Sequence, residues 1–460
     1  MKKNVFLGLA VVLLCAPLGA VEVPDSLLLN PEEEKVTFLT LQDALNVALA
    51  ESETVKIADK EVERAGYAKK GTYAALFPQI DLTGSYQRTL IKNDIRAMMG
   101  SDSPMASMMA DTKIGSLNTF AVNATAAMPL INTALWKSIK ISAQGVELAV
   151  EKARGSRLDL VAQVKNAYYA ALLAREVFGV YREVYENAKA NFQQTEKKYN
   201  AQKASELDMV TARTNLANAI PNVYEAESNV ILALWQLKAV IGMDLEEEID
   251  VVGRMEDYSD NMSAVPDGRD SIDLSGNSSL RQLSIQADQL LETVKLRQRA
   301  YIPTLSASVN FSYSSVANDP IRNLGWFPYS NAGLTLSIPI FSGMKRLNDV
   351  RQARNQYQQM QLQTRNTEKQ LRIGVRGYLS TMDTAVKSYY ASKNALESAQ
   401  KAYEIAAKSY EVGRATFVEL NNAQLALVQS QLSLSQNVYN YIVAKADLES
   451  MLGVENFETK

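Results

Sequence analysis

The sequence predicts a mainly α-helical chain that also carries four membrane-length β-strands, built as two copies of one helix-strand-strand-helix-helix unit. Three observations lead to this fold class. Short segments alternate apolar and polar residues, two stretches of more than 60 residues contain no proline, and similar motifs recur in the same order 210 to 225 positions apart. Such self-similarity is typical of a tandem duplication.

The first 20 residues have the pattern of a secretory signal peptide. A basic start, an apolar stretch at residues 5–14 and a small-residue site ending at Ala20 follow one another in the usual order. The single cysteine, Cys15, lies inside this segment, and because Leu14 before it is not small we do not expect a lipid anchor there. Disulfides are therefore not expected to contribute to the mature chain.

The composition argues against several classes of function. The 48 basic and 51 acidic residues give a net charge of −3, and without a basic run a nucleic-acid partner is not expected. The chain has no histidine, and it lacks nucleophile-elbow, P-loop and dinucleotide motifs, so we expect no enzyme, no cofactor and no metal site. No apolar run after the signal reaches the 18 residues of a membrane-spanning helix, so strands would have to cross any membrane.

The repeated motifs divide the chain into two copies. They predict a first repeat at residues 21–242, a linker at 243–276, a second repeat at 277–453 and a tail at 454–460. The pairs that define them are Phe77-Pro78 with Ile302-Pro303, Met128-Pro129 with Ile338-Pro339, and Val240-Ile241-Gly242 with Met451-Leu452-Gly453.

The first helix is expected between Thr40 and Pro78. Thr40 can cap the free backbone N–H groups, and Asp43 stands where its carboxylate reaches back to them. Pro78 is expected to end the helix, because the residue before a proline is pushed out of the α region.

Four strands of about ten residues are expected, two in each copy, at about 79–89, 118–128, 304–314 and 332–340. In the third, Leu305, Val309 and Phe311 fall on one face while serines and Asn310 fall on the other. This length crosses a bilayer when the strand is tilted. The polar faces carry Ser, Thr, Asn and Gly, and the aromatic residues of segment 326–329 fall at a strand end, where a membrane interface favours them. A half-buried sheet in a soluble protein is the alternative.

Long helices are expected to follow each strand pair. Residues 134–199 and 344–410 can each run as one helix of roughly 100 Å at 1.5 Å per residue. Small residues from Ala395 to Gly413, and apolar ones from Leu420 to Met451, recur at spacings of three and four, which indicates coiled-coil packing. An open sheet in lipid would leave unpaired edges, so the strands are expected to close around a water-filled lumen with three or more chains.

The duplication, the Phe77-Pro78 and Ile302-Pro303 strand entries, the turn at residues 338–343 and Tyr410-Glu411-Val412-Gly413 resemble the TolC-like outer-membrane efflux protein family of Gram-negative bacteria. The resemblance implies a homotrimer whose 12-stranded barrel, four strands per chain, lies among outer-membrane lipids and continues as an α-helical periplasmic tunnel. It also implies a passive exit duct for a tripartite efflux pump or a type I secretion system. Its partners would be a periplasmic adaptor protein and an inner-membrane transporter of the RND or ABC type.

The resemblance also locates a periplasmic gate at the helix-hairpin tips, with Tyr410 as a constriction residue and Asp208 as its bonding partner. Glu419 would form a carboxylate ring that attracts cations. Two departures stand out: the family's gating arginine falls on Ala415 beside Arg414, and Asn422 replaces a second acidic ring. We expect Asp208, Tyr410 and Arg414 to lock the closed state. Adaptor docking is expected at tip residues Gln202, Ala204, Ser205, Gly413, Ala415 and Thr416, with Gln202 standing where the family often has glycine.

Two alternatives remain open from the sequence. A periplasmic adaptor or a structural coiled-coil protein without a pore would also carry long helices, although neither would be expected to duplicate strand pairs between them. A methionine-rich segment at residues 98–109 could handle Cu(I) or could simply pack between loops. Nothing in the sequence identifies the cargo.

Overall fold

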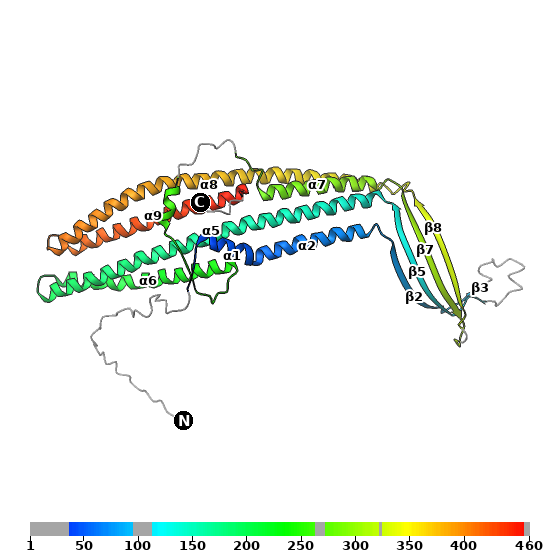
Figure 1. The fold of residues 1–460 in the computed structure, drawn as a ribbon, viewed down its shortest axis with the longest axis horizontal. Helices are drawn as coiled ribbons and strands as arrows, with labels where there is room; N and C mark the ends of the chain where they lie inside the picture. Colours follow the sequence, from blue (N-terminus) through cyan, green and yellow to red (C-terminus); the bar gives the residue numbers. More distant parts are fainter. Residues whose placement is uncertain (1–35, 95–112, 263–271, 322–323, 455–460) are drawn as a thin grey trace, which may run out of the picture.

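The computed structural model describes residues 36–94, 113–262, 272–321 and 324–454. The expected signal peptide, the methionine-rich segment and residues 455–460 of the tail lie outside these ranges. Figure 1 shows long, nearly parallel helices that lead into one curved sheet at the end of the molecule.

Two helical hairpins form the end that lies farthest from the sheet (Figure 1). The first joins α5 (Thr133–Asn200) to α6 (Glu206–Ile241), and the second joins α8 (Lys345–Glu411) to α9 (Phe417–Leu452). The predicted helices at 134–199 and 344–410 are thus present to within one residue at each end. Their length follows from the absence of proline inside α5 and α8.

The helix expected between Thr40 and Pro78 is two helices, so that prediction was wrong in its continuity. The capping box is confirmed, because the Asp43 carboxylate accepts from the Thr40 hydroxyl at 2.6 Å and the Asp43 amide donates to the Thr40 hydroxyl oxygen. However, α1 (Leu41–Glu51) stops at Ser52, whose extended ψ of 129° separates it from α2 (Glu53–Ala74). The end of α6 lies against this break, and α2 ends before Pro78 is reached.

Part of the expected linker lies in the main hydrophobic core. Strand β6 (Ile249–Val251) pairs in parallel with β1 (Thr37–Leu39), and the 3-10 helix η2 (Met255–Asn261) follows it. Val251 and Met255 are almost completely buried. The Tyr168 hydroxyl of α5 donates to the Val252 carbonyl at 2.6 Å, which ties the segment to the long helices. No long apolar run in this segment indicates such a core.

The sheet contains four antiparallel strands in the order β2-β5-β7-β8. These are β2 (Gln79–Arg88), β5 (Asn118–Ile131), β7 (Thr304–Ala317) and β8 (Trp326–Ser337), with the short pair β3 (Asn93–Asp94) and β4 (Lys113–Ile114) beyond them. The strand expected at 332–340 begins six residues earlier and ends three earlier. Pairing stops at Thr304 and Ser337 because Pro303 and Pro339, just beyond them, cannot donate to the ladder.

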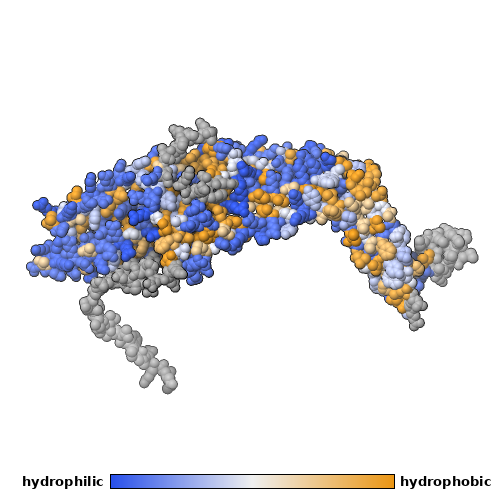
Figure 2. Space-filling model, viewed as in Figure 1, coloured by the Kyte–Doolittle hydropathy of each residue, from blue (hydrophilic) through white to orange (hydrophobic). Residues whose placement is uncertain are grey.

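The sheet exposes large apolar side chains. Ile80 and Leu82 on β2, and Leu334 on β8, are each at least 70% exposed. Figure 2 shows apolar surface gathered over the sheet and its junction with the helices, whereas the hairpin end is mainly hydrophilic. A contiguous apolar surface of this kind marks a site that contacts lipid or another protein.

In the second copy, the C-terminal end of α9 contacts the N-terminal end of α7 (Ser278–Arg299). The Asn277 carbonyl oxygen Oδ1 accepts from the Leu280 amide at the start of α7, while its Nδ2 donates to the Met451 carbonyl at the end of α9. One side chain therefore satisfies free backbone groups at both helix ends. The arrangement makes α9 and α7 an almost continuous column beside α5.

Candidate functional site

The two hairpin tips have the same backbone construction. Each helix ends in a left-handed residue, Gln202 with φ 58° in the first hairpin and Gly413 with φ 76° in the second. The amides that follow, of Lys203 and Arg414, each donate at 2.7 Å to a carbonyl five residues back. These bonds close the helix ends in the way that Schellman motifs do. The duplication therefore extends to single backbone hydrogen bonds.

The two expected gate carboxylates cap the helices that leave these turns. Asp208 accepts from the Ser205 hydroxyl at 2.7 Å, and Glu419 accepts from the Thr416 backbone amide at 2.7 Å. The hydrogen bond from the Thr416 backbone, followed by the one from its hydroxyl, lowers the pKa of Glu419 below its usual value. Both carboxylates thus stabilise helix starts, and both stand at the end of the molecule.

Tyr410 joins the two hairpins within the chain. It is 7% exposed, and its hydroxyl lies 2.7 Å from the hydroxyl of the fully buried Thr195 on α5. Lys198 donates to the Tyr410 carbonyl at 3.0 Å, with its Nζ 4.3 Å from the centre of the tyrosine ring. Phe417 packs edge-on against that ring, at 5.7 Å between centroids. The contact fastens the end of α8 to the end of α5.

Within one chain, the residues expected to lock the gate with Tyr410 bond to other groups or are exposed. Across the described part of the chain Asp208 bonds to Ser205 and not to Tyr410, while Arg414 and Asn422 are exposed. Sequence reasoning missed Thr195 and Lys198, which lie more than 200 positions from Tyr410 and belong to no motif. Only the position of Tyr199, the counterpart of Tyr410 in the first hairpin, could have drawn attention to that helix end.

The expected docking residues all lie in the two turns. Gln202, Ser205, Gly413 and Thr416 are exposed, whereas Ala204 and Ala415 are half-buried. Ala415 contacts the buried cluster formed by Ala212, Tyr410, Phe417 and Leu420. The tips thus expose a mixture of polar, charged and apolar side chains, among them Lys203, Arg414 and Val412, over a small apolar base.

A second polar contact joins the hairpins farther from the tips. The Asn215 amide on α6 donates to the Asn421 oxygen on α9 at 2.8 Å. Further asparagines line the adjoining groove of about 310 Å³, among them Asn191, Asn218 and Asn222. The seam between the hairpins is therefore held by amide groups in a solvent-accessible groove.

The comparisons with known proteins agree with this construction. The family described as outer membrane efflux protein matches residues 44–243 and 272–454, which is most of the chain. The chain belongs to the outer membrane efflux protein family. An outer-membrane location in a Gram-negative bacterium follows from its membership of this family.

Among the relatives of this outer membrane efflux protein is "Outer membrane protein TolC" of Escherichia coli, 21% identical over 78% of this chain and 74% of the relative. "Alkaline protease secretion protein AprF" of Pseudomonas aeruginosa is 23% identical over 90% and 85%. Among solved structures, the Campylobacter jejuni CmeC outer membrane channel has a TM-score of 0.71 at 18% identity, covering 90% of this chain and 85% of CmeC. The open-state Neisseria gonorrhoeae MtrE channel has 0.67 at 16%, covering 90% and 88%. The shared fold is thus that of outer membrane channels.

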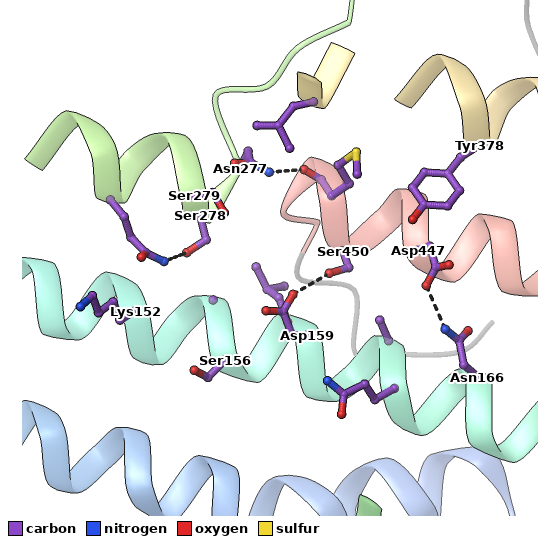
Figure 3. A pocket seen from close by; sticks show the side chains of 17 residues that line it. Lys152, Ser156, Asp159, Asn166, Asn277, Ser278, Ser279, Tyr378, Asp447 and Ser450 are labelled. Carbon is purple, nitrogen blue, oxygen red and sulfur yellow. Dashed lines mark hydrogen bonds between the residues drawn. The ribbon is translucent and has the colours of Figure 1, made fainter. Parts of the chain in front are cut away.

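A pocket of about 580 Å³ lies where α5, α7, α8 and α9 meet. Figure 3 shows Asp159 pointing to Ser450, and Asn166 pointing to Asp447 at 2.9 Å. These bonds cross from α5 to α9 and hold the column described above. The pocket is a hydrated seam between helices, and we assign no ligand to it.

A buried carboxylate joins the helical body just below the sheet. Glu292 on α7, with a side chain only 4% exposed, accepts from Lys137 at 2.7 Å, Lys295 at 2.8 Å and Lys140 at 3.0 Å. The hydrogen bonds from Lys137 and Lys295 lower the pKa of Glu292 to about 2. Since Lys137 follows β5 and Glu292 precedes β7, the cluster holds the end of β5 beside the start of β7.

The described residues contain neither a membrane-spanning helix nor a cluster of metal ligands. No helix among them has both the length and the apolarity to span a membrane. Within those same ranges, no three Cys, Asp or Glu side chains gather in a way that could hold a metal ion.

Proposed function

We propose that three copies of this chain form a continuous exit duct through the outer membrane, with the sheets closed into one barrel and the hairpins into a periplasmic tunnel. The observation that carries the proposal is the sheet itself. In the described residues neither β2 nor β8 has a partner on its outer edge, and each unpaired backbone group in lipid costs several kcal/mol. Pairing β8 of one copy with β2 of the next satisfies both edges, giving 12 strands from three chains.

The two faces of the sheet support the same proposal. Ile80, Leu82 and Phe311 share one face, whereas Thr83, Asn123 and Ser312 share the other. Barrels in the outer membrane alternate apolar residues toward lipid with polar residues toward a watery interior. The chain would then conduct passively and perform no chemistry of its own.

The tips are the proposed meeting point with a periplasmic adaptor protein, and through it with an RND or ABC transporter of the inner membrane. Their exposed turns, which carry charged side chains such as Lys203 and Arg414 beside the exposed Leu207 and Val412, fit a docking surface for another protein. The name of the relative AprF refers to protease secretion, which favours a type I secretion system as one role. A tripartite efflux pump is the other.

Closure of the duct is proposed to depend on contacts between hairpins near the tips. Within a chain, Thr195 and Lys198 hold Tyr410 in place. Between copies, Asp208 and Arg414 would add the contacts that the family resemblance implies, while Glu419 and Asn422 would set the charge of the constriction.

Conductance in a planar lipid bilayer tests the duct, together with the mass of the detergent-solubilised particle. Three chains per particle and small, brief currents are expected from the closed wild type. Asp208→Ala and Arg414→Ala should enlarge these currents, whereas Ser205→Ala, which weakens the same cap as Asp208→Ala, should not. Folded particles without any current would refute the duct, and equal currents from Asp208→Ala and Ser205→Ala would refute the role of Asp208 between copies.

A further inference from the structure

Two aromatic residues lie on the polar face of the sheet. The antiparallel register pairs Phe327 with Ser314 and Tyr329 with Ser312. Residues directly opposite each other in an antiparallel pair share a face, and alternate residues along a strand share one too. Because the pairing of β8 with β7 runs without a bulge, both rings must lie on the face of the serines.

The surroundings of these rings are small and polar. Across the sheet, the row of Tyr329 continues through Ser312 to Asn123 and Thr83, and the row of Phe327 continues through Ser314 to Ala121 and Ser85. Phe327 is 62% exposed and Tyr329 63% exposed. Nothing of their size stands beside them on that face of β2, β5 or β7, so packing within the sheet does not explain them.

A membrane-interface role is already filled by other residues on the opposite face. Trp326 pairs with Ser315, and its ring stacks on Tyr313 at 5.2 Å with an interplanar angle of 16°. Such aromatic pairs on a lipid-facing surface suit the interface between membrane and water. Phe327 and Tyr329 point the other way, and they stand within roughly 10 Å of the strand end that lies away from the helices.

The polar face also carries negative charge. Among the residues of the four strands on that face, Asp81 is the one charged side chain. It belongs to the row of Thr125, Asn310 and Asn331, next to the row of Tyr329, and the Asn310 amide donates to the Asn331 oxygen at 3.0 Å. Aromatic faces and a carboxylate both attract cations, and aromatic faces also stack on flat rings.

We propose that Phe327 and Tyr329 form a binding site for planar aromatic cations inside the duct, near its outer mouth. The inference rests on the proposed function, since only closure of the barrel turns the polar face into a lumen. In a trimer the site would appear three times around one axis, so that six rings and three Asp81 carboxylates line the last part of the exit path. The site would give a passive duct a preference among the molecules that leave through it.

Block of the bilayer current by ethidium, a planar aromatic cation, tests the site. The full mature chain is compared with the double variant Phe327→Ser, Tyr329→Ser, and with Trp326→Leu as a control that removes an aromatic from the opposite face. The half-blocking concentration of ethidium is expected to rise roughly 5- to 30-fold in the double variant and to stay unchanged in the control. Conductance of potassium chloride alone should change little in the Trp326→Leu control, whose ring lies on the opposite face.

A second variant keeps the test decisive if the serine variant does not assemble. Phe327→Leu, Tyr329→Leu preserves apolar area but removes the ring faces, and it should lose most of the block. Equal block of this variant and of the wild type by ethidium would overturn the aromatic site. If an aromatic sulfonate of similar size blocked the wild type as well as ethidium does, the preference for cations would be overturned. A folded wild type with no current would instead refute the proposed duct, so the two failures are distinguishable.

Discussion

The two hairpin tips have the same fold but different relations to the rest of the chain. Tyr199 and Tyr410 occupy equivalent positions at the ends of α5 and α8, yet Tyr199 is 36% exposed while Tyr410 is 7% exposed. The second tip has Gly413 where the first has Gln202, so only the first holds a side chain in the left-handed region. The two turns thus share one backbone structure, but only the second hairpin, through Tyr410, contacts the other hairpin with its tyrosine.

The largest difference between the tips is expected from removing the two tyrosines. Tyr410→Ala empties a buried space and should lower the free energy of unfolding of the hairpin region by about 3 kcal/mol. Tyr199→Ala should cost less than about 1 kcal/mol, because its ring is partly in water. Chemical denaturation in detergent, followed by helical circular dichroism, compares them. Equal losses would show that the tips do not differ in packing.

A smaller effect is expected from the hydrogen bond alone. Thr195→Val keeps the shape of the side chain but leaves the buried Tyr410 hydroxyl without its partner, at a cost of about 1–2 kcal/mol. Combining it with Tyr410→Phe should add little to that loss. The double-mutant cycle is the measurement, and strictly additive losses would contradict a direct bond.

The turns themselves should respond in opposite directions. Gln202→Gly relieves a left-handed residue and should stabilise the first tip by about 0.5 kcal/mol, whereas Gly413→Gln should destabilise the second by about 1 kcal/mol. The same denaturation experiment measures both. A loss of stability in Gln202→Gly would mean that the Gln202 side chain makes a contact that offsets its strain.

The smallest expected effect concerns Glu419. Its pKa in the folded chain lies below the unfolded value near 4.5, because its charged form accepts from the Thr416 backbone. Its contribution to stability is therefore complete above that unfolded value and is lost as the pH falls through the folded pKa. Carboxyl NMR titration should show the lowered pKa, and Thr416→Ala should raise it only part of the way toward 4.5, because it removes the hydroxyl bond and keeps the backbone one. An unchanged pKa in Thr416→Ala would leave the backbone amide as its sole cause.

Local patterns predicted the parts of the fold that depend on neighbours in the sequence. The Thr40–Asp43 capping box, the two proline-free helices and the alternating faces of β2, β5 and β7 all follow from residues within a few positions of one another. The break at Ser52 was not predictable in this way, because it depends on the end of α6 nearly 200 positions later. The same holds for the paired strands β1 and β6, which come from the first repeat and the linker.

The candidate site likewise combines features that were predictable from local sequence with features that depend on distant residues. Tyr410, Asp208 and Glu419 lie at the hairpin tips, which is the location expected for them from the sequence. Their partners did not follow from it, since hydrogen bonds such as Thr195 to Tyr410 depend on how two long helices align. An offset of one residue along α5 would have brought a different side chain to that tyrosine.

We propose that the contact made by Tyr410, and not the equivalent residue Tyr199, helps to keep the duct closed. Single-channel conductance of the wild type, Tyr410→Phe and Tyr199→Phe in one planar bilayer preparation measures this difference. We expect larger and longer openings in Tyr410→Phe, with Tyr199→Phe indistinguishable from the wild type. Identical currents from all three proteins, or openings enlarged equally by both substitutions, would contradict it.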